Sequence, residues 1–443
     1  MIGKTPRNPQ FNIFQTPLVN FIDLEHPMCV LAHKIDWQEL ENEFSGYFSD
    51  FGRPSVPVRK MVGLILIKHI KNLSDRELTV GWIENPYWQY FCGEVHFQKS
   101  EPFDPSEFTY FRKRIGEKGA EKIFRLSILL FGKEAQEKEV LIDTTVQEKN
   151  ITFPTDTKLQ KRIIDKVVKI AKEEGILLRQ TYARTIPQLM IEQRFRNHPK
   201  RKKKANAAAR KIKTIAGRVV RDLDHKMDLN QKSWYKDDLE VFRKVLVQKR
   251  NTPNKIYSLH ELHVKCIAKG KEAKEYEFGN KSSIVKTRKS GIIIGAMAFT
   301  ENLFDGDTLQ PQLDQVERLL GHKPKVAIVD RGYRGRSQIN DTQICTPKPL
   351  PKNATEYQKH KTRERFRSRA GIEPIIGHLK HDHRMLRNYL KGIEGDKVNT
   401  LLAAAAFNMK KMLNRITKSL KNYLHLIVKL LLGDYKYLIL TYN

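Results

Sequence analysis

Apolar residues in the first 135 positions recur at helical spacing, and helix-start signals interrupt them. Val58–Ile70 is apolar on most sides, which predicts a buried helix. Ser74 with Glu77 three residues later forms a capping box, and Asp104, followed by a proline and by Glu107, marks a second helix start. The pattern predicts a helical N-terminal region. Two interpretations stay open for it, a helix-turn-helix DNA reader and a plain helical bundle.

The pattern then alternates between strands and helices. Residues 138–147 form a short apolar strand pattern, and residues 155–254 combine dense charge with apolar residues at helical spacing. Strand patterns return near residue 255, and from Thr355 onward the pattern is helical again. The other predicted elements are strands at 255–267, 275–285, 291–299, 325–330 and 344–347, and a helix at 311–320 closed by Gly321. Strands on both sides of a long helical segment predict an α/β sheet with a helical insertion.

These segments predict three parts. Residues 1–135 form a helical N-terminal domain, residues 136–413 form an α/β core with a helical insertion at about 155–254, and residues 414–443 form a helical tail. The tail contains the most apolar stretch of the chain, Tyr423–Tyr442, but charged residues interrupt it. We therefore expect a packed terminal helix there and no membrane span.

The net positive charge of the chain indicates what kind of molecule it binds. The chain carries 81 Lys and Arg residues against 50 Asp and Glu residues, a formal net charge of +31. Such an excess is rare in metabolic enzymes and favours a polyanionic partner, first of all nucleic acid. Residues 155–254 alone hold 27 basic and 11 acidic side chains. Within their basic run at 200–204, we expect Lys202 and Lys203 to contact phosphates, although a solvated face is the plain alternative.

Cysteine usage and the first residues indicate the compartment. The four cysteines lie far apart and form no CxxC pair, which argues against a zinc ribbon and against a disulfide framework. The first ten residues lack the apolar core of a signal peptide. We therefore expect a reduced, intracellular protein that has no membrane partner.

Two aspartates follow apolar strand patterns directly. Val140–Ile142 runs into Asp143, and Val326–Val329 runs into Asp330. An acid in this position lies at the carboxyl end of a strand, where α/β folds bind ligands. Each aspartate alone is most simply a turn residue. On neighbouring parallel strands, however, the two carboxylates would repel each other and attract a divalent cation.

Glu373 is the third candidate acid. If its segment is one continuous helix, the residues that share its face are Gly377, Lys380, Arg384 and Arg387. The proline that follows Glu373 places it in the first helical turn. A carboxylate beside cations suits a metal ion and the phosphates of a nucleic acid. The plain alternative is an amphipathic basic helix with one paired glutamate.

The same segment resembles the Y-R-E-K signature of the DDE transposases of bacterial insertion sequences. That signature separates Tyr, Arg, Glu and Lys by two, three and six residues, and this chain has Phe366, Arg369, Glu373 and Lys380 at those spacings. Phenylalanine at the tyrosine position lacks the hydroxyl but keeps an aromatic ring. The signature is therefore present with one departure.

Three further segments carry the resemblance. Residues 329–335, VDRGYRG, resemble the family's second-aspartate motif, and residues 141–145, LIDTT, resemble the first. Residues 52–78 look like the helical N-terminal domain of the insertion-sequence-five type. The resemblance thus covers roughly residues 50–412.

The resemblance implies an RNase H-like core, a mixed sheet with flanking helices, in which Asp143, Asp330 and Glu373 hold two Mg²⁺ ions that Mn²⁺ can replace. It also implies that Arg369 and Lys380 neutralise phosphates near the scissile bond. The other residues for which we expect DNA contacts are Arg331, Tyr333, Arg384, Lys202 and Lys203. For Tyr333, simple packing is an equal alternative.

The function that the resemblance implies is DNA transposition. The protein would bind the terminal inverted repeats of its element, cleave the DNA ends and join the freed 3′-hydroxyl to target DNA. Its partners would be double-stranded DNA and a second copy of the chain, in the cytoplasm of a bacterium at the nucleoid. Two alternatives stay open: a metal-dependent nuclease without strand transfer, and a non-catalytic DNA-binding protein descended from a transposase.

Overall fold

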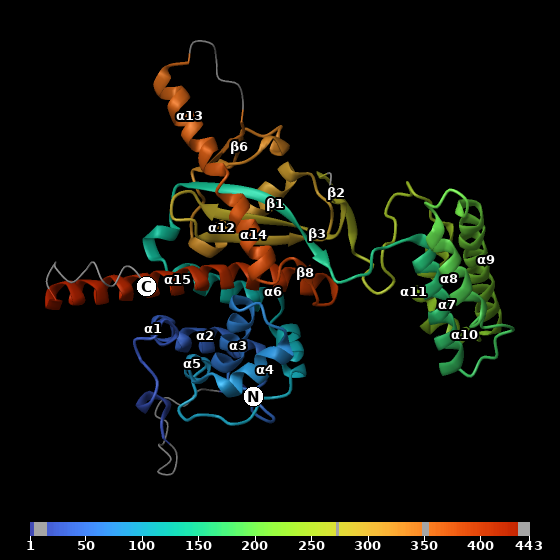
Figure 1. The fold of residues 1–443 in the computed structure, drawn as a ribbon, viewed down its shortest axis with the longest axis horizontal. Coiled ribbons are helices and arrows are strands. Elements are labelled where there is room, and N and C mark those ends of the chain that lie inside the picture. Colours follow the sequence, from blue (N-terminus) through green and yellow to red (C-terminus); the bar gives the residue numbers. More distant parts are fainter. Residues whose placement is uncertain (4–15, 272–273, 348–353, 433–443) are drawn as a thin grey trace. The chain divides into compact units, whose positions relative to one another are not determined.

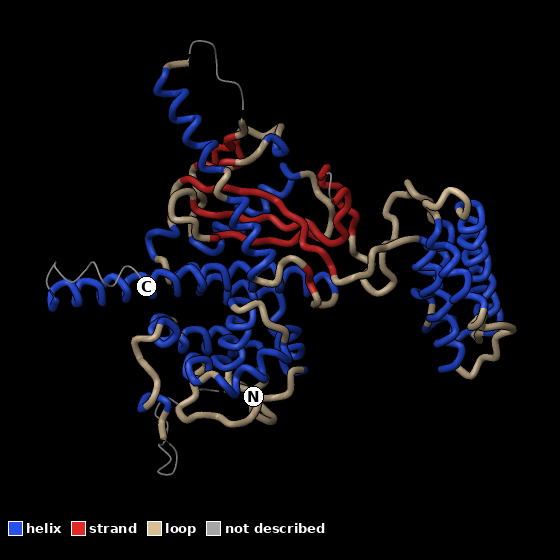
Figure 2. Tube along the Cα trace, viewed as in Figure 1, coloured by secondary structure: helices blue, strands red, loops and turns tan. Residues whose placement is uncertain are grey.

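The computed structural model describes residues 1–3, 16–271, 274–347 and 354–432 of the chain (Figure 1). They form two compact units: a core unit of residues 1–148 and 281–443, and an inserted unit of residues 149–280. Figure 2 shows helices and strands in these parts of the chain. None of the helices in the described ranges is long and apolar enough to cross a membrane.

The N-terminal region is helical, as its sequence predicts. Its helices are α1 (Pro27–Lys34), α2 (Trp37–Phe44), α3 (Val58–Ile70), α4 (Asp75–Glu84), α5 (Pro86–Phe91) and α6 (Ser106–Leu129). The capping box before α4 is confirmed: the Glu77 N–H donates to Ser74 Oγ at 3.2 Å, and the Ser74 N–H donates to the Glu77 carboxylate at 2.7 Å. The start of α6 lies one residue later than predicted, and Asp104 accepts the Ser106 N–H at 2.8 Å.

One mixed sheet forms the centre of the core unit. Its strands follow the order β4–β3–β1–β5–β7–β6, and β8 pairs with β1 at one place. β4 is antiparallel to β3 and β6 is antiparallel to β7, whereas β1, β5 and β7 are parallel. The bounds are β1 (Glu139–Lys149), β3 (Lys274–Thr287), β4 (Ile293–Phe299), β5 (Val326–Ile328), β6 (Gln338–Ile339), β7 (Thr342–Cys345) and β8 (Arg387–Asn388). This sheet, its flanking helices and the helical N-terminal region are compatible with the RNase H-like fold of a DDE core.

Four further helices belong to the core unit. They are α12 (Leu309–Leu320), α13 (Glu356–Arg369), α14 (Ile372–Asp382) and α15 (Gly392–Leu432). Gly321 closes α12 in the left-handed region at φ 79°, as predicted. The predicted helical tail is the end of α15, which runs unbroken to Leu432; residues 433–443 lie outside the described part.

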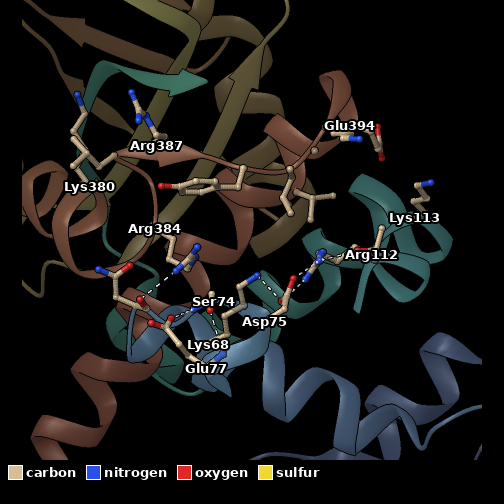
Figure 3. Close-up of a pocket in the computed structure, with 18 of the residues that line it drawn as sticks. Lys68, Ser74, Asp75, Glu77, Arg112, Lys113, Lys380, Arg384, Arg387 and Glu394 are labelled. Carbon is tan, nitrogen blue, oxygen red and sulfur yellow. Dashed lines mark hydrogen bonds and ion pairs between the residues drawn. The ribbon is translucent and has the colours of Figure 1, made fainter. Parts of the chain in front are cut away.

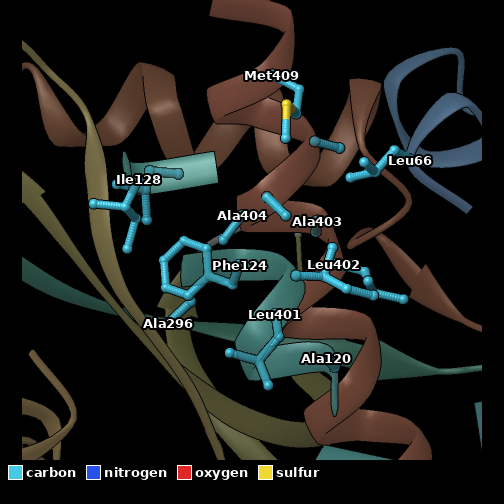
Figure 4. Packing of buried hydrophobic residues seen from close by; sticks show 14 of the residues in the cluster. Leu66, Ala120, Phe124, Ile128, Ala296, Leu401, Leu402, Ala403, Ala404 and Met409 are labelled. Atoms are coloured by element: carbon cyan, nitrogen blue, oxygen red, sulfur yellow. The ribbon is translucent and has the colours of Figure 1, made fainter. Parts of the chain in front are cut away.

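Helix α15 joins the N-terminal helices to the sheet. It packs against α1, α3 and α6 and against β4. Figure 4 shows Ala403 and Ala404 of α15 among Phe124 of α6, Ala296 of β4 and Leu66 of α3. All five side chains are fully buried. The small alanines let the helix approach its neighbours closely, and large apolar residues fill the remaining space.

The inserted unit has a hydrophobic core of its own. Its helices are α7 (Asp156–Glu173), α8 (Thr185–Glu192), α9 (Lys202–Lys226), α10 (Leu229–Trp234) and α11 (Lys236–Val247). Buried apolar residues at helical spacing, such as Leu159, Ile163 and Val167 on α7, form one cluster with Ile212 and Phe242. β2 (Lys265–Lys271) and the first part of β3 pair as an antiparallel hairpin in this unit.

The strand predicted at 255–267 is wrong for most of its length, because β2 begins only at Lys265. In the segment before β2, the Gln248 side chain makes the hydrogen bonds to the backbone of Ile256 that a neighbouring strand would otherwise make. Ile256 donates its N–H to Gln248 Oε1 at 3.1 Å, and Gln248 Nε2 donates to the Ile256 carbonyl at 3.2 Å. The sequence of this segment alternates like a strand, but its backbone at Ile256 bonds to a side chain and not to another strand.

Candidate active site

Asp143 and Asp330 occupy matching positions on two neighbouring strands. β1 and β5 pair in parallel, and Leu141 is the partner of Ile328. The pairing ends at Leu141 and Ile328, and Asp143 and Asp330 each follow two residues later. Neighbouring strands lie roughly 4.8 Å apart, and residues two apart share one face of a sheet. The two carboxylates therefore belong to the same face as Leu141 and Ile328.

Helices α13 and α14 cover this face of the sheet. Leu141 and Ile328 form a small apolar cluster with Ile372, the first residue of α14, and with the partly buried Phe366 of α13. Glu373 follows Ile372 directly, so α14 begins over the strands that carry the aspartates. Phe366, at the position of the signature tyrosine, uses its ring to hold α13 against the sheet. The loss of the tyrosine hydroxyl is compatible with this packing role.

A close turn orients Asp330. The Gly332 N–H donates to Asp330 Oδ1 at 2.7 Å, and residues Arg331–Tyr333 form a short 3-10 helix. A Cβ at position 332 would lie 2.9 Å from Asp330 Oδ1 and 3.1 Å from Asp305 Oδ2. A side chain at position 332 would therefore have to displace the carboxylate of Asp330, and it would crowd that of Asp305. Asp143 is fixed in a similar way, since its Oδ1 accepts the Thr144 N–H at 2.8 Å.

Glu373 lies in the first turn of α14, as its proline neighbour predicts. Its side chain is exposed and makes no hydrogen bond or ion pair with other described residues. The described residues contain no group of three or more His, Cys, Asp or Glu side chains gathered closely enough to hold a metal ion. Asp143 and Asp330 thus follow the paired residues of two strands, and Glu373 lies on the covering helix. The three carboxylates are not gathered closely enough to form a complete set of metal ligands.

The donor chemistry suits a hard divalent cation. Asp143, Asp330 and Glu373 offer carboxylate oxygens, which Mg²⁺ prefers, and no cysteine or histidine competes among the residues argued for this site. Two partly exposed aspartates side by side gain from a cation between them. These three residues are therefore the ones that would hold a metal ion.

Tyr333 is a correction to the expected DNA contacts. Its side chain is 1% exposed and belongs to the hydrophobic core. Burial, and then the nearby carboxylates of Asp143 and Asp305, raises the pKa of Tyr333. The structure therefore fits the packing alternative, because the ring presents no surface to DNA.

The helix that carries Glu373 is shorter than expected. α14 ends at Asp382, so only Gly377 and Lys380 continue the face of Glu373. Arg384 lies beyond the end with φ 66°, and its guanidinium donates to the Asn72 carbonyl at 3.1 Å. The expectation of one basic face from Glu373 to Arg387 is wrong, because Arg387 belongs to β8. The residue that follows the helix directly, His383, is buried.

Lys380, Arg384 and Arg387 nevertheless meet in one cavity. It has a volume of about 910 Å³ and lies between the N-terminal helices and the end of α14 (Figure 3). Lys68 of α3 and Arg112 of α6 converge there on Asp75 of α4, at 2.7 and 2.8 Å. The other charged residues of the lining are Glu77, Lys113, Lys391 and Glu394. The lining carries more cations than carboxylates, which suits a phosphate backbone.

The remaining candidate residues lie at the surface. Arg331 is exposed in the turn after Asp330, and Arg369 is partly exposed at the end of α13. Lys202 and Lys203 are exposed in the first turn of α9, in the inserted unit. Sequence reasoning missed Asp305, which lies in the 3-10 helix Asp305–Thr308 and accepts the Thr144 hydroxyl at 2.8 Å. No motif marks it, because only the fold brings it to Asp143.

Two buried histidines beside the cavity predict a pH dependence of stability. His69 is 1% exposed and hydrogen-bonds through Nδ1 to the Ile65 carbonyl, and His383 hydrogen-bonds through Nδ1 to the His69 carbonyl, both at 2.9 Å. Burial lowers the pKa of His69 to about 3 and that of His383 to about 4, from 6.5. The unfolded chain therefore binds protons first, and the free energy of unfolding should fall as the pH falls below about 6.5.

The measurement is urea unfolding between pH 7.5 and 4.5. His383→Gln should flatten the slope of the free energy of unfolding against pH, because one of the two groups is removed. His360→Gln is the control, since His360 is exposed on α13 and has no side-chain partner among the described residues, so that its replacement should leave the slope as it is. Equal slopes in the wild type and His383→Gln would contradict the prediction.

Comparisons with known proteins bear on this geometry. Residues 17–114 match the family described as Transposase domain (DUF772), and residues 250–409 match the family described as Transposase DDE domain. The second match contains Asp330 and Glu373, whereas Asp143 precedes it. A curated relative from Rhizobium meliloti, "Uncharacterized protein ORF8 in nfe locus", is 38% identical over 198 residues, which are 44% of this chain and 96% of the relative. No solved structure gives a significant match. The chain belongs to the DDE transposases of insertion sequences, and it is therefore a metal-dependent DNA transposase.

Proposed function

We propose that this transposase binds the terminal inverted repeats of its element, cleaves the DNA ends at Asp143, Asp330 and Glu373, and joins the 3′-hydroxyl to target DNA. The observation that carries the proposal is the parallel β1–β5 pairing, because Asp143 and Asp330 each follow its last pair, Leu141 and Ile328, by two residues. Helix α14 begins over the same face of the sheet and carries Glu373 next to the buried Ile372. Two strands whose pairing ends near an aspartate and a helix that begins with Ile372 and Glu373 thus share one face of the sheet.

The cofactor of the proposed reaction is Mg²⁺, with two ions at the site and Mn²⁺ as a substitute. When bound, such ions activate the attacking oxygen and stabilise the leaving oxygen of the phosphodiester. The chain's own part is to hold the ligands in place. Backbone N–H groups of Thr144 and Gly332 orient the two aspartates. The exposed Glu373 has no partner to lose among the described residues when it turns toward a cation.

DNA binding is proposed to use both units of the chain, each through its own basic surface. In the core unit, Lys380 and Arg384 line the basic cavity, and Arg369 is partly exposed near the covering helix. In the inserted unit, the exposed Lys202 and Lys203 begin α9 within a segment rich in Lys and Arg. We propose that this basic helical insertion clamps DNA. A homodimer would pair two transposon ends.

The test is cleavage of a duplex that carries the element's own ends. Glu373→Gln keeps the shape of the side chain and removes its charge, and we expect cleavage to fall by at least about 10²-fold while DNA binding persists. Glu356→Gln is the matched control, because Glu356 is an exposed glutamate in the first turn of α13. Cleavage is measured with the wild type and both variants, with Mg²⁺ and with EDTA.

The outcomes separate the possible functions. Cleavage by the wild type and by Glu356→Gln, but not by Glu373→Gln, supports the proposal. Equal cleavage by all three proteins would remove Glu373 from the site. Cleavage without joining of precut ends to a target would indicate a nuclease. Specific binding without any cleavage would indicate a DNA-binding protein that has lost catalysis.

A further inference from the structure

One ion pair beside the two aspartates has no place in the proposed reaction. Lys281 of β3 donates to Asp305 Oδ1 at 2.8 Å and to the Leu303 carbonyl at 2.6 Å. The Lys281 side chain is only 12% exposed. The same Asp305 oxygen accepts the hydroxyl of Thr144 at 2.8 Å. Because Thr144 follows Asp143 directly, the ammonium group lies within one hydrogen-bonded network with the strand that carries Asp143.

The second oxygen of Asp305 faces Asp330. Asp305 Oδ2 and Asp330 Oδ1 both lie about 3 Å from one point, the place where a Cβ of Gly332 would be. The buried Tyr333 hydroxyl is also in this neighbourhood, close to Thr144 and to the carboxylates of Asp143, Asp305 and Asp330. Asp305 is thus placed between Lys281 on one side and Asp330 on the other.

This placement has an electrostatic consequence. A lysine ammonium on a flexible stem pairs with whichever carboxylate is near, and such pairing is strong where water is scarce. Asp143, Asp305 and Asp330 all act electrostatically on the Tyr333 hydroxyl, so two further carboxylates lie near this network if the charge of Asp305 is removed. An ammonium bound there would compete directly with a divalent cation for the same oxygens.

We propose that Asp305 is a positioning residue of the active site: it holds the Lys281 ammonium in an ion pair and so keeps that positive charge from competing with a metal ion at Asp143 and Asp330. The proposal rests on the metal site proposed above. It assigns Asp305 no contact with the metal or with DNA. Its effect passes through Lys281, so the two residues must show a specific dependence on each other.

The experiment measures Mn²⁺ binding to the full-length protein without DNA, by the loss of the free Mn²⁺ signal in electron paramagnetic resonance. Asp305→Asn keeps the acceptor for Thr144 but removes the charge, and we expect about tenfold weaker Mn²⁺ binding. The double variant Lys281→Met with Asp305→Asn should recover binding to within about twofold of the wild type. Asp305→Glu, which keeps the charge, should bind nearly as the wild type does.

Recovery in the double variant is the deciding result, because a purely structural role of the ion pair predicts no rescue. Circular dichroism shows that each variant is folded. Unchanged binding in Asp305→Asn, or a double variant as weak as Asp305→Asn, would overturn the proposal. Asp330→Asn separates a failure of the proposed metal site from a failure of the proposed role of Asp305. If this variant leaves Mn²⁺ binding unchanged, the metal site itself is wrong. If Asp330→Asn abolishes binding and Asp305→Asn does not weaken it, only the role of Asp305 fails.

Discussion

Asp330→Asn should lower DNA cleavage by about 10³-fold, which corresponds to about 4 kcal/mol of transition-state stabilisation. The asparagine can still accept the Gly332 N–H through Oδ1, so the turn and the fold should persist. What is lost is the negative charge of Asp330, and with it the attraction for a divalent cation. Asp143→Asn should have an effect of similar size. Combining the two changes should add little, because the residues act as one unit.

The control for Asp330→Asn is Asp341→Asn, an exposed aspartate in the turn between β6 and β7. Single-turnover cleavage of a duplex with the element's ends gives the rates, and filter binding gives the DNA affinity. Cleavage by Asp330→Asn within tenfold of the wild type would contradict the assignment. Loss of DNA affinity in the same variant would mean that its effect is not confined to catalysis.

Asp75→Ala should lower the free energy of unfolding by about 3–5 kcal/mol, because it leaves two buried cations without their counter-ion. Lys68 and Arg112, with side chains 6% and 7% exposed, both pair with Asp75. The hydrogen bond from Arg112, together with the charge of Lys68, outweighs the cost of burial and lowers the pKa of Asp75 to about 2. Burial, and then the charge of Arg112, lowers the pKa of Lys68 to about 8.

Urea unfolding at pH 7 measures the effect of Asp75→Ala. The control is Asp165→Ala, which removes an exposed ion pair with Lys161 at 2.5 Å and should cost at most about 1 kcal/mol. A loss below about 1 kcal/mol in Asp75→Ala would contradict the prediction. Addition of short duplex DNA extends the test, since an anion in the cavity should stabilise the variant more than it stabilises the wild type.

Local signals predicted the elements that depend on few distant contacts. The bounds of α3 follow from a run of apolar residues, and the Ser74 capping box and Gly321 mark real helix ends. The segment at 255–267 was misjudged because a side chain of α11's C-cap, Gln248, replaces a partner strand. The continuous helix from Glu373 to Arg387 failed for a related reason. Its end is set by His383, which is buried against the distant His69.

The residues of the candidate site also differ in whether the sequence alone could indicate them. Asp143 and Asp330 could be proposed from sequence because each follows an apolar strand, and the parallel pairing of those two strands is what the structure adds. Asp305 could not be proposed, because no motif surrounds it and its partners Thr144 and Lys281 lie far away in sequence. The division into N-terminal, core and tail parts stays a prediction, as do the roles of the site residues.

Helix α15 determines when the N-terminal helices can complete their packing during synthesis of the chain. Its residues Leu402 to Met409 fill the space between the N-terminal helices and β4, so those helices gain this buried partner only after α15 has been synthesised. The inserted unit ends at residue 280 and has its own apolar cluster, so its packing does not depend on α15. Residues 149–280 can thus pack on the nascent chain while the space beside β4 is still unfilled. The core unit would then reach its final packing only once α15 has been synthesised.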